Sequence, residues 1–167
     1  DDRSASEATR AAALRVLQPF HEPKVVDGLI ARLGAESDAS RRGGLITALG
    51  RLYNTEKEWD GDWWTTRPAT VGPYFSPVTW SESAKIATTF DGALQKATTA
   101  DAVQIGRAYT KFSIPAGEAV LKLVSVADQD PALLALVAER FAAAAEVPSS
   151  AIPVLVRAAT APTTAAT

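Results

Sequence analysis

The sequence predicts an all-α fold, and three observations support that prediction. Apolar residues recur at intervals of three and four along successive segments, as they do on the buried face of a helix. Prolines, glycines and helix-capping residues separate these segments. No segment alternates apolar and polar residues over the length of a strand with turn signals at both ends. With 167 residues, the chain is long enough to bury a core as one domain.

Three helices are expected before residue 54, over residues 4–20, 23–33 and 38–53. Ser4 and Glu7 have the spacing of a capping box, Pro23 suits a first helical turn, and Asp38 is an N-cap candidate. The side chains expected to face inward are Ala8, Ala11, Leu14 and Leu17, then Val26, Leu29, Ile30 and Leu33, then Leu45, Ile46, Leu49, Leu52 and Tyr53.

Five more helices are expected after residue 80. Their expected starts are, in order, Ser81, Thr99 or Asp101, Pro115, Asp130 with Pro131, and Pro153. Their expected inward residues are Ile86, Phe90, Leu94 and Ala97; Ala102, Ile105, Tyr109 and Phe112; Val120, Leu121, Val124 and Ala127; Leu133, Leu134, Val137 and Phe141; and Ile152, Leu155 and Val156.

The eight helices have similar lengths and short connections, and taken two at a time they give pairs of roughly 40 residues. This spacing favours a HEAT- or armadillo-like α-solenoid of about four helix pairs. A closed bundle would show the same apolar stripes and remains the alternative. We therefore expect a helical-repeat domain over residues 1–160, with a long loop at 54–80 inserted in the second pair, and a flexible tail or linker at 161–167.

The inserted loop concentrates aromatic residues. All four tryptophans of the chain lie between Trp59 and Trp80, together with Tyr74, Phe75 and three prolines. Loops longer than about 12–15 residues are usually functional or disordered, and disordered segments are poor in aromatics. We therefore expect an ordered lid that folds back over the helices. In the simplest interpretation its aromatics only seal the loop onto the scaffold.

A binding role is the other interpretation of this loop. Tryptophan faces flanked by carboxylates and an arginine suit stacking on a sugar or anchoring a protein partner. The candidate binding residues are Trp59, Asp60, Asp62, Trp63, Trp64, Arg67 and Tyr74. Arg67 has a structural alternative, which is an ion pair with Asp60 or Asp62.

The stretch from Gly61 to Phe75, GDWWTTRPATVGPYF, resembles a GDWWGTRPxTxGPYY signature. That signature is found in HEAT-repeat regions of large exported multidomain proteins of planctomycetes and related bacteria, which join a dehydrogenase-like β-propeller to a c-type cytochrome domain. Thr65 stands where the signature has glycine, and Phe75 where it has tyrosine. The resemblance implies a helical-repeat module of a periplasmic or extracellular redox or carbohydrate-processing protein, and it implies no catalytic residues.

Composition argues against several functions. A net charge of −2 does not suit a nucleic-acid groove, and no apolar run is long enough to insert in a membrane. The chain has no cysteine, no methionine and one histidine, so we expect no cofactor and no metal. His21 is interpreted as a surface turn residue. The acidic residues Glu56, Glu58, Asp60 and Asp62 are interpreted as a solvated run, not as a glycosidase pair or a calcium loop.

These observations favour a non-catalytic scaffold that binds other domains of its parent protein, or a separate protein partner, through the tryptophan-rich loop. The alternative is a carbohydrate-binding module, or an accessory substrate site, that uses Trp63, Trp64 and Arg67 to hold a glycan. An independent hydrolase is the least favoured interpretation, because the single histidine is not accompanied by a nucleophile motif.

Overall fold

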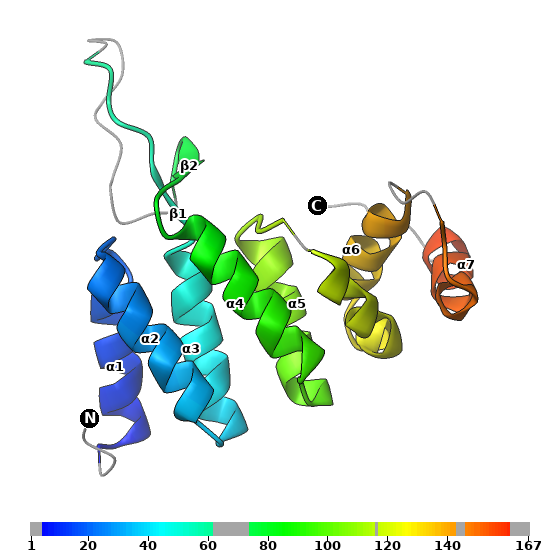
Figure 1. Cartoon of the computed structure of the whole chain (residues 1–167), viewed down its shortest axis with the longest axis horizontal. Helices are drawn as coiled ribbons and strands as arrows, with labels where there is room; N and C mark the ends of the chain where they lie inside the picture. The colour runs from blue at the N-terminus through cyan, green and yellow to red at the C-terminus, as the bar shows by residue number, and fades with distance from the viewer. Residues whose placement is uncertain (1–4, 62–73, 116, 143–145, 161–167) are drawn as a thin grey trace. The chain divides into compact units, whose positions relative to one another are not determined.

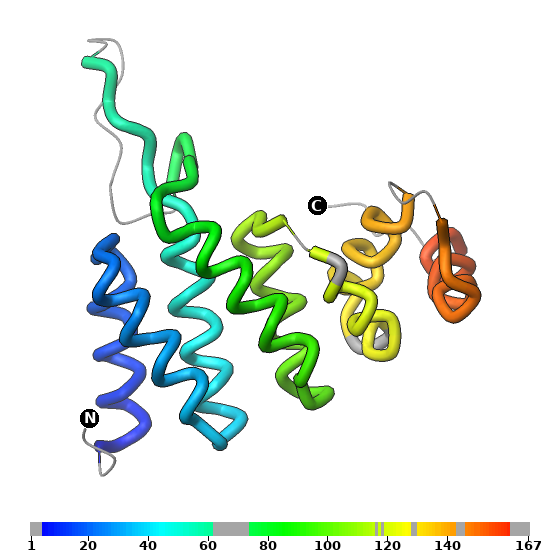
Figure 2. The backbone as a smooth tube through the Cα atoms, in the orientation of Figure 1, coloured from blue at the N-terminus to red at the C-terminus, as the bar shows by residue number. Residues whose placement is uncertain are grey.

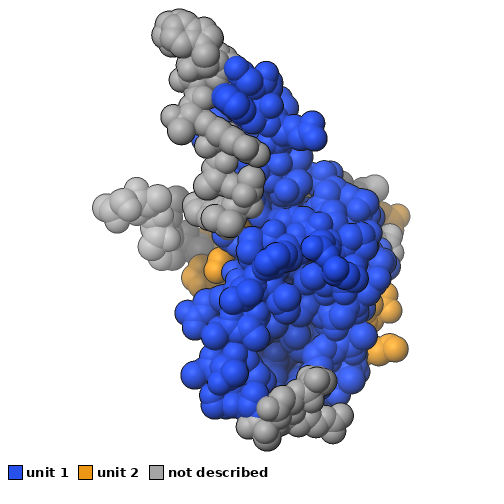
Figure 3. Space-filling view, turned by 90° about the vertical axis from the view of Figure 1, so that its left-hand side faces the viewer, with its two compact units in different colours: residues 1–90 blue, residues 91–167 orange. Residues whose placement is uncertain are grey.

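The structure is a computed structural model that describes residues 5–61, 74–115, 117–142 and 146–160. It confirms the all-α prediction, because helices dominate and the described residues include only one short pair of strands (Figure 1). All eight expected helices are present, seven as α-helices and the sixth as a 3₁₀ helix. The chain divides into two compact units, Asp1–Phe90 and Asp91–Thr167 (Figure 3), and the division falls within α4 (Ser83–Gln95).

The first unit is built on three helices, α1 (Glu7–Leu17), α2 (Pro23–Ala35) and α3 (Ala39–Arg51). Both α1 and α2 lie against α3, so α1 makes its main contact with α3 and not with α2, its expected partner. Local signals set the helix starts. Pro23 occupies the first turn of α2, and the Asp38 side chain accepts a hydrogen bond from the backbone N–H of Arg41 at 2.9 Å.

The first helix corrects two expectations. Its N-cap is Ser6, whose hydroxyl oxygen accepts a hydrogen bond from the Thr9 N–H, whereas the sequence pointed to Ser4. None of its residues is buried, and Ala8 and Ala11 on the expected inward face are exposed. The physical reason is the small size of alanine, because a stripe of methyl groups does not reach far enough to fill the space beside α3.

Two short strands frame the expected loop. β1 (Asn54–Glu56) and β2 (Pro77–Thr79) pair antiparallel, with Thr55 opposite Val78. The sequence did not indicate them, since three residues are too few to show an alternating pattern. Residues 57–61 continue from β1 away from the helices (Figures 1 and 2). The expected lid over the helices would be formed by residues 62–73, which lie outside the described part of the chain.

The start of α4 also differs from the expectation. The helix begins at Ser83, two residues after the predicted cap at Ser81. The Ser83 hydroxyl accepts a hydrogen bond from the Trp80 N–H at 2.9 Å and donates one to the Tyr53 carbonyl oxygen at 2.6 Å. Ser83 therefore ties the start of α4 to the chain that follows α3.

The second unit contains α5 (Thr99–Lys111), η1 (Glu118–Gln129), α6 (Pro131–Ala142), η2 (Ser149–Ala151) and α7 (Ile152–Thr160). η1 packs against α5 and α6, and α6 packs against α7. α5 starts at Thr99 and α6 at Pro131, as predicted. The core includes Tyr109, whose hydroxyl donates a hydrogen bond to Asp91 at 2.6 Å. Burial, followed by this bond, raises the pKa of the Tyr109 phenol.

The sixth helix begins at Glu118 and not at Pro115, and its 3₁₀ geometry changes which side chains face inward. With three residues per turn, side chains three apart share a face. Val120, Leu123 and Val126 are buried, and so are Ala119 and the expected Ala127, whereas Leu121, an expected inward residue, is 47% exposed. In α7 the buried residue is Val154, while the expected Ile152 and Val156 are exposed. The tail at 161–167 lies outside the described residues.

Candidate functional site

The candidate site is the base of the tryptophan-rich loop, which we call the hairpin stem and define as residues 54–61 and 74–80. β1 and β2 form its centre. Of the predicted binding residues, Trp59, Asp60 and Tyr74 belong to the stem. Asp62, Trp63, Trp64 and Arg67 lie outside the described residues, so their predicted roles remain predictions.

Trp80 anchors one end of the stem to α3. Its indole Nε1–H donates a hydrogen bond to the carbonyl oxygen of Leu52 at 2.7 Å. Leu52 is the C-cap of α3, where carbonyl groups have no partner within the helix. The Trp80 side chain therefore provides a hydrogen-bond donor for a carbonyl group at the C-terminal end of α3, and its ring packs against His21. This residue has a structural role and not a binding one.

His21 joins the stem to the connection between α1 and α2. Its Nε2 lies 2.8 Å from the carbonyl oxygen of Asn54, a distance that fits an N–H donating to that oxygen. The imidazole also packs edge-on against Trp80, with ring centroids 5.2 Å apart, and against Tyr74 at 6.1 Å. The interpretation of His21 as a surface turn residue is therefore wrong, because the side chain is half-buried and in contact with three residues of the stem.

Tyr74 is half-buried at the base of the stem. The Arg51 guanidinium carbon lies 5.7 Å from the centre of the Tyr74 ring, within the range of a cation–π contact. Burial raises the pKa of the Tyr74 phenol, and the charge of Arg51 opposes that shift. Tyr74 was a candidate binding residue. It contacts the scaffold residues His21 and Arg51, and its binding role stays a prediction.

The Glu56 side chain links the two sides of the stem by hydrogen bonds. Its two carboxylate oxygens accept hydrogen bonds from the backbone N–H groups of Phe75, at 2.7 Å, and Ser76, at 2.8 Å. The Lys57 N–H also donates to the Ser76 carbonyl oxygen at 2.9 Å. Bonds of this kind to a carboxylate are stronger than those between neutral groups. Glu56 is thus a structural link across the loop, not a member of a solvated acidic run.

Apolar side chains of the stem remain exposed despite these anchors. Phe75 is 82% exposed, Trp59 is 45% exposed and Val78 is 37% exposed. Asp60 follows Trp59 and is exposed as well. Gly61 has a φ of 81°, which favours glycine at this turn. In one of the two interpretations of the loop Phe75 only sealed it onto the scaffold, and its exposure does not fit that interpretation.

Comparisons with protein-family models, with curated proteins and with solved structures find no match to this chain. Within the part of the chain that the structure describes, no three His, Cys, Asp or Glu residues cluster as metal ligands would. The same residues form no helix that is long and apolar enough to cross a bilayer.

Proposed function

We propose that the chain is a non-catalytic helical scaffold that binds a protein through the exposed face of its hairpin stem. The observation that carries the proposal is the combination of a fixed backbone with an exposed aromatic side chain at Phe75. An exposed phenylalanine contributes nothing to the core, and aromatic residues are enriched where proteins bind one another. The partner would be another domain of a parent protein or a separate chain.

The anchoring contacts support this role energetically. Binding is weakened when a loop must first become ordered, because ordering costs conformational entropy. In the stem this cost is met during folding, through the bonds of Glu56, His21 and Trp80 to the chain around them. Phe75 is then held on a preformed surface.

The resemblance of residues 61–75 to HEAT-repeat regions of exported multidomain proteins agrees with such a scaffold. In this proposal the helices form the pairs of an α-solenoid, whose repeats present an insertion from one face. The parent protein would be a redox or carbohydrate-processing protein in the periplasm or outside the cell. The predicted residues Trp63, Trp64 and Arg67 would extend the binding surface of the stem.

A glycan is the second candidate ligand, and the exposed pair Trp59 and Asp60 favours it. An indole face stacks on a sugar ring, and a neighbouring carboxylate accepts hydrogen bonds from its hydroxyls. Titration with soluble β-linked hexasaccharides, followed by tryptophan fluorescence, distinguishes the two candidates. A saturable change that Trp59→Ala abolishes would assign the stem to glycan binding and replace the protein-partner proposal.

The proposal is tested by photo-cross-linking in the cells that produce the protein. A benzophenone amino acid replaces Phe75, and in a matched variant it replaces Val16, which is 63% exposed on α1. Position 75 is expected to give a discrete cross-linked product that position 16 does not give. Similar smears or no product at both positions would contradict a binding role for this face.

A further inference from the structure

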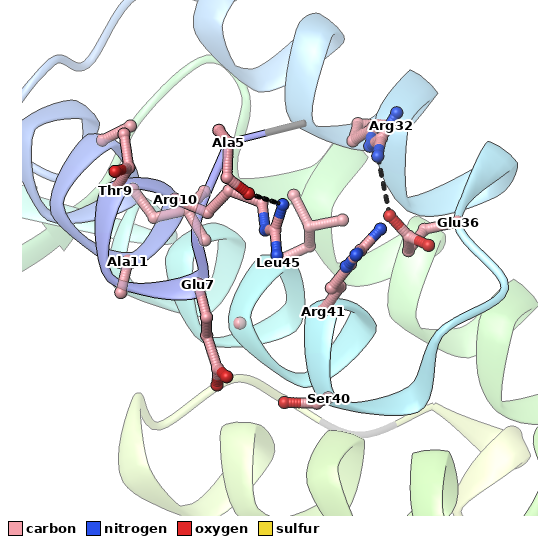
Figure 4. Close-up of a pocket in the computed structure, with 13 residues that line it drawn as sticks. Ala5, Glu7, Thr9, Arg10, Ala11, Arg32, Glu36, Ser40, Arg41 and Leu45 are labelled. Atoms are coloured by element: carbon pink, nitrogen blue, oxygen red, sulfur yellow. Dashed lines mark hydrogen bonds and ion pairs between the residues drawn. The ribbon is translucent and has the colours of Figure 1, made fainter. Parts of the chain in front are cut away.

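A cavity of about 440 Å³ lies between α1 and α3, in the first unit and apart from the hairpin stem (Figure 4). Arg32 and Glu36, at the end of α2, complete its lining. Pockets that hold one small molecule typically span about 300–1,000 Å³. The cavity is therefore large enough for a small ligand.

Its floor is apolar. Leu14 and Ala11 of α1 face Leu45 and Gly44 of α3 across the cavity. Gly44 brings the two helices close, since a methyl group there would lie 3.3 Å from a terminal carbon of Leu14. Because α1 buries none of its own residues, this face is only partly filled by the protein. An apolar group placed here would gain contacts that the chain itself does not supply.

The charges around the cavity fall into two groups. Glu36 and Arg32 form an ion pair at 2.7 Å, and Glu36 also accepts the N–H groups of Ser37 and Asp38. The bond from the Asp38 N–H, then the ion pair with Arg32 and the charge of Arg41, hold the pKa of Glu36 below its ordinary value, and burial opposes the shift. Glu36 is thus ionised and already satisfied. Glu7, the other acidic residue of the lining, is exposed, and in Figure 4 it points away from the arginines.

Two further arginines, Arg10 and Arg41, make no ion pair with the described residues. Arg10 donates a hydrogen bond to the carbonyl oxygen of Ala5, and no described carboxylate lies within ion-pair distance of it. Arg41 is half-buried, and its guanidinium group makes no hydrogen bond or ion pair with the described residues, although its charge helps to lower the pKa of Glu36. In the view of Figure 4 the two side chains flank Leu45. A partly buried cation without a partner favours an incoming anion.

We propose that this cavity binds a monocarboxylate with an apolar chain, a small fatty acid or a similar compound. Its carboxylate would accept hydrogen bonds from Arg41 and Arg10, whose planar guanidinium groups match the two carboxylate oxygens. Its chain would lie on the floor formed by Leu14 and Leu45. The arginines alone would bind any anion, and the apolar floor alone would bind any apolar chain. A ligand that carries both groups is specified because the two features lie side by side.

Isothermal titration with octanoate and with octan-1-ol tests the proposal, because the two probes share the chain and differ in charge. The protein is expected to bind octanoate more tightly than the alcohol by at least about tenfold, the value of one charge-assisted hydrogen bond. Arg41→Gln should remove most of this preference and leave binding of the alcohol unchanged. The cap of α3 survives the substitution, since it uses the Arg41 backbone N–H.

Arg10→Gln gives an independent variant on the opposite wall, and Arg15→Gln is the control. Arg15 lies on α1 outside the cavity, with its side chain exposed. Both wall variants should lose octanoate affinity and the control should keep it. Absence of octanoate binding, equal affinity for the two probes, or full affinity in both wall variants would overturn the proposal.

Discussion

Trp80→Ala is expected to lower the free energy of unfolding by about 3 kcal/mol, near the lower end for truncation of a packed tryptophan. The substitution removes the ring that packs against His21 and leaves the carbonyl oxygen of Leu52 without its hydrogen bond. Both the ring contact and the hydrogen bond are lost where the stem joins α3. Urea unfolding followed by circular dichroism measures the change.

Phe75→Ala is the matched control for this prediction. Phe75 belongs to the same stem but is 82% exposed, and its link to Glu56 uses only the backbone N–H. The expected loss is about 0.5 kcal/mol or less, as for an exposed side chain. Comparable losses in the two variants would mean that Phe75 is also structural. The division of the stem into anchoring and exposed aromatics would then be wrong.

Leu123→Ala should cost about 2–5 kcal/mol, because Leu123 is fully buried in the core of the second unit. Leu121→Ala should cost about 0.5 kcal/mol, because Leu121 is 47% exposed. The two residues are two positions apart in η1, so the pair reports which face of this helix is inward.

The opposite order would mean that the sixth helix turns inward the face expected from the sequence. With 3.6 residues per turn, the face expected from the sequence places Leu121 and Val124 inward. The structure instead buries Val120, Leu123 and Val126, together with Ala119 and Ala127. Thermal unfolding of the two variants, compared with the parent protein, decides between these arrangements.

The features that the sequence predicted well depend on neighbouring residues. Asp38 caps α3 through a bond to Arg41, and Asp130 precedes Pro131 at the start of α6, where its carboxylate accepts the Ala132 N–H at 2.9 Å. Signals of this kind span two or three residues and can be read directly from the chain. The same holds for most core residues, whose spacing follows the helical period.

The features that the sequence did not reveal depend on distant residues. His21 contacts the backbone of Asn54, 33 positions away, and no local pattern indicates that pairing. Glu56 reaches Phe75 and Ser76 across the loop, so an apparently solvated acid became a structural link. The unfilled cavity beside α1 likewise follows from the packing of small alanine side chains, and a periodic stripe of alanines does not distinguish a buried face from an open one.

The location of the candidate site was predictable because aromatic residues gather in one stretch. Which aromatic residues of the site anchor it and which remain exposed could not be predicted. Tyr74 and Trp80 are of the types that also dominate binding surfaces, yet both contact the scaffold. Phe75, which the sequence did not single out for binding, is the most exposed large apolar side chain among the described residues. Exposure depends on the path of the backbone, which residue type alone does not determine.

Amide hydrogen exchange of the native protein tests whether the hairpin stem is a fixed platform. A two-stranded hairpin alone is marginally stable in water, so its amides exchange freely unless other contacts hold it. We expect protection of the Lys57, Ser76 and Trp80 amides approaching that of the α3 amides, since each donates a hydrogen bond within the anchored stem. Exchange of these three amides at unprotected rates while α3 stays protected would contradict it.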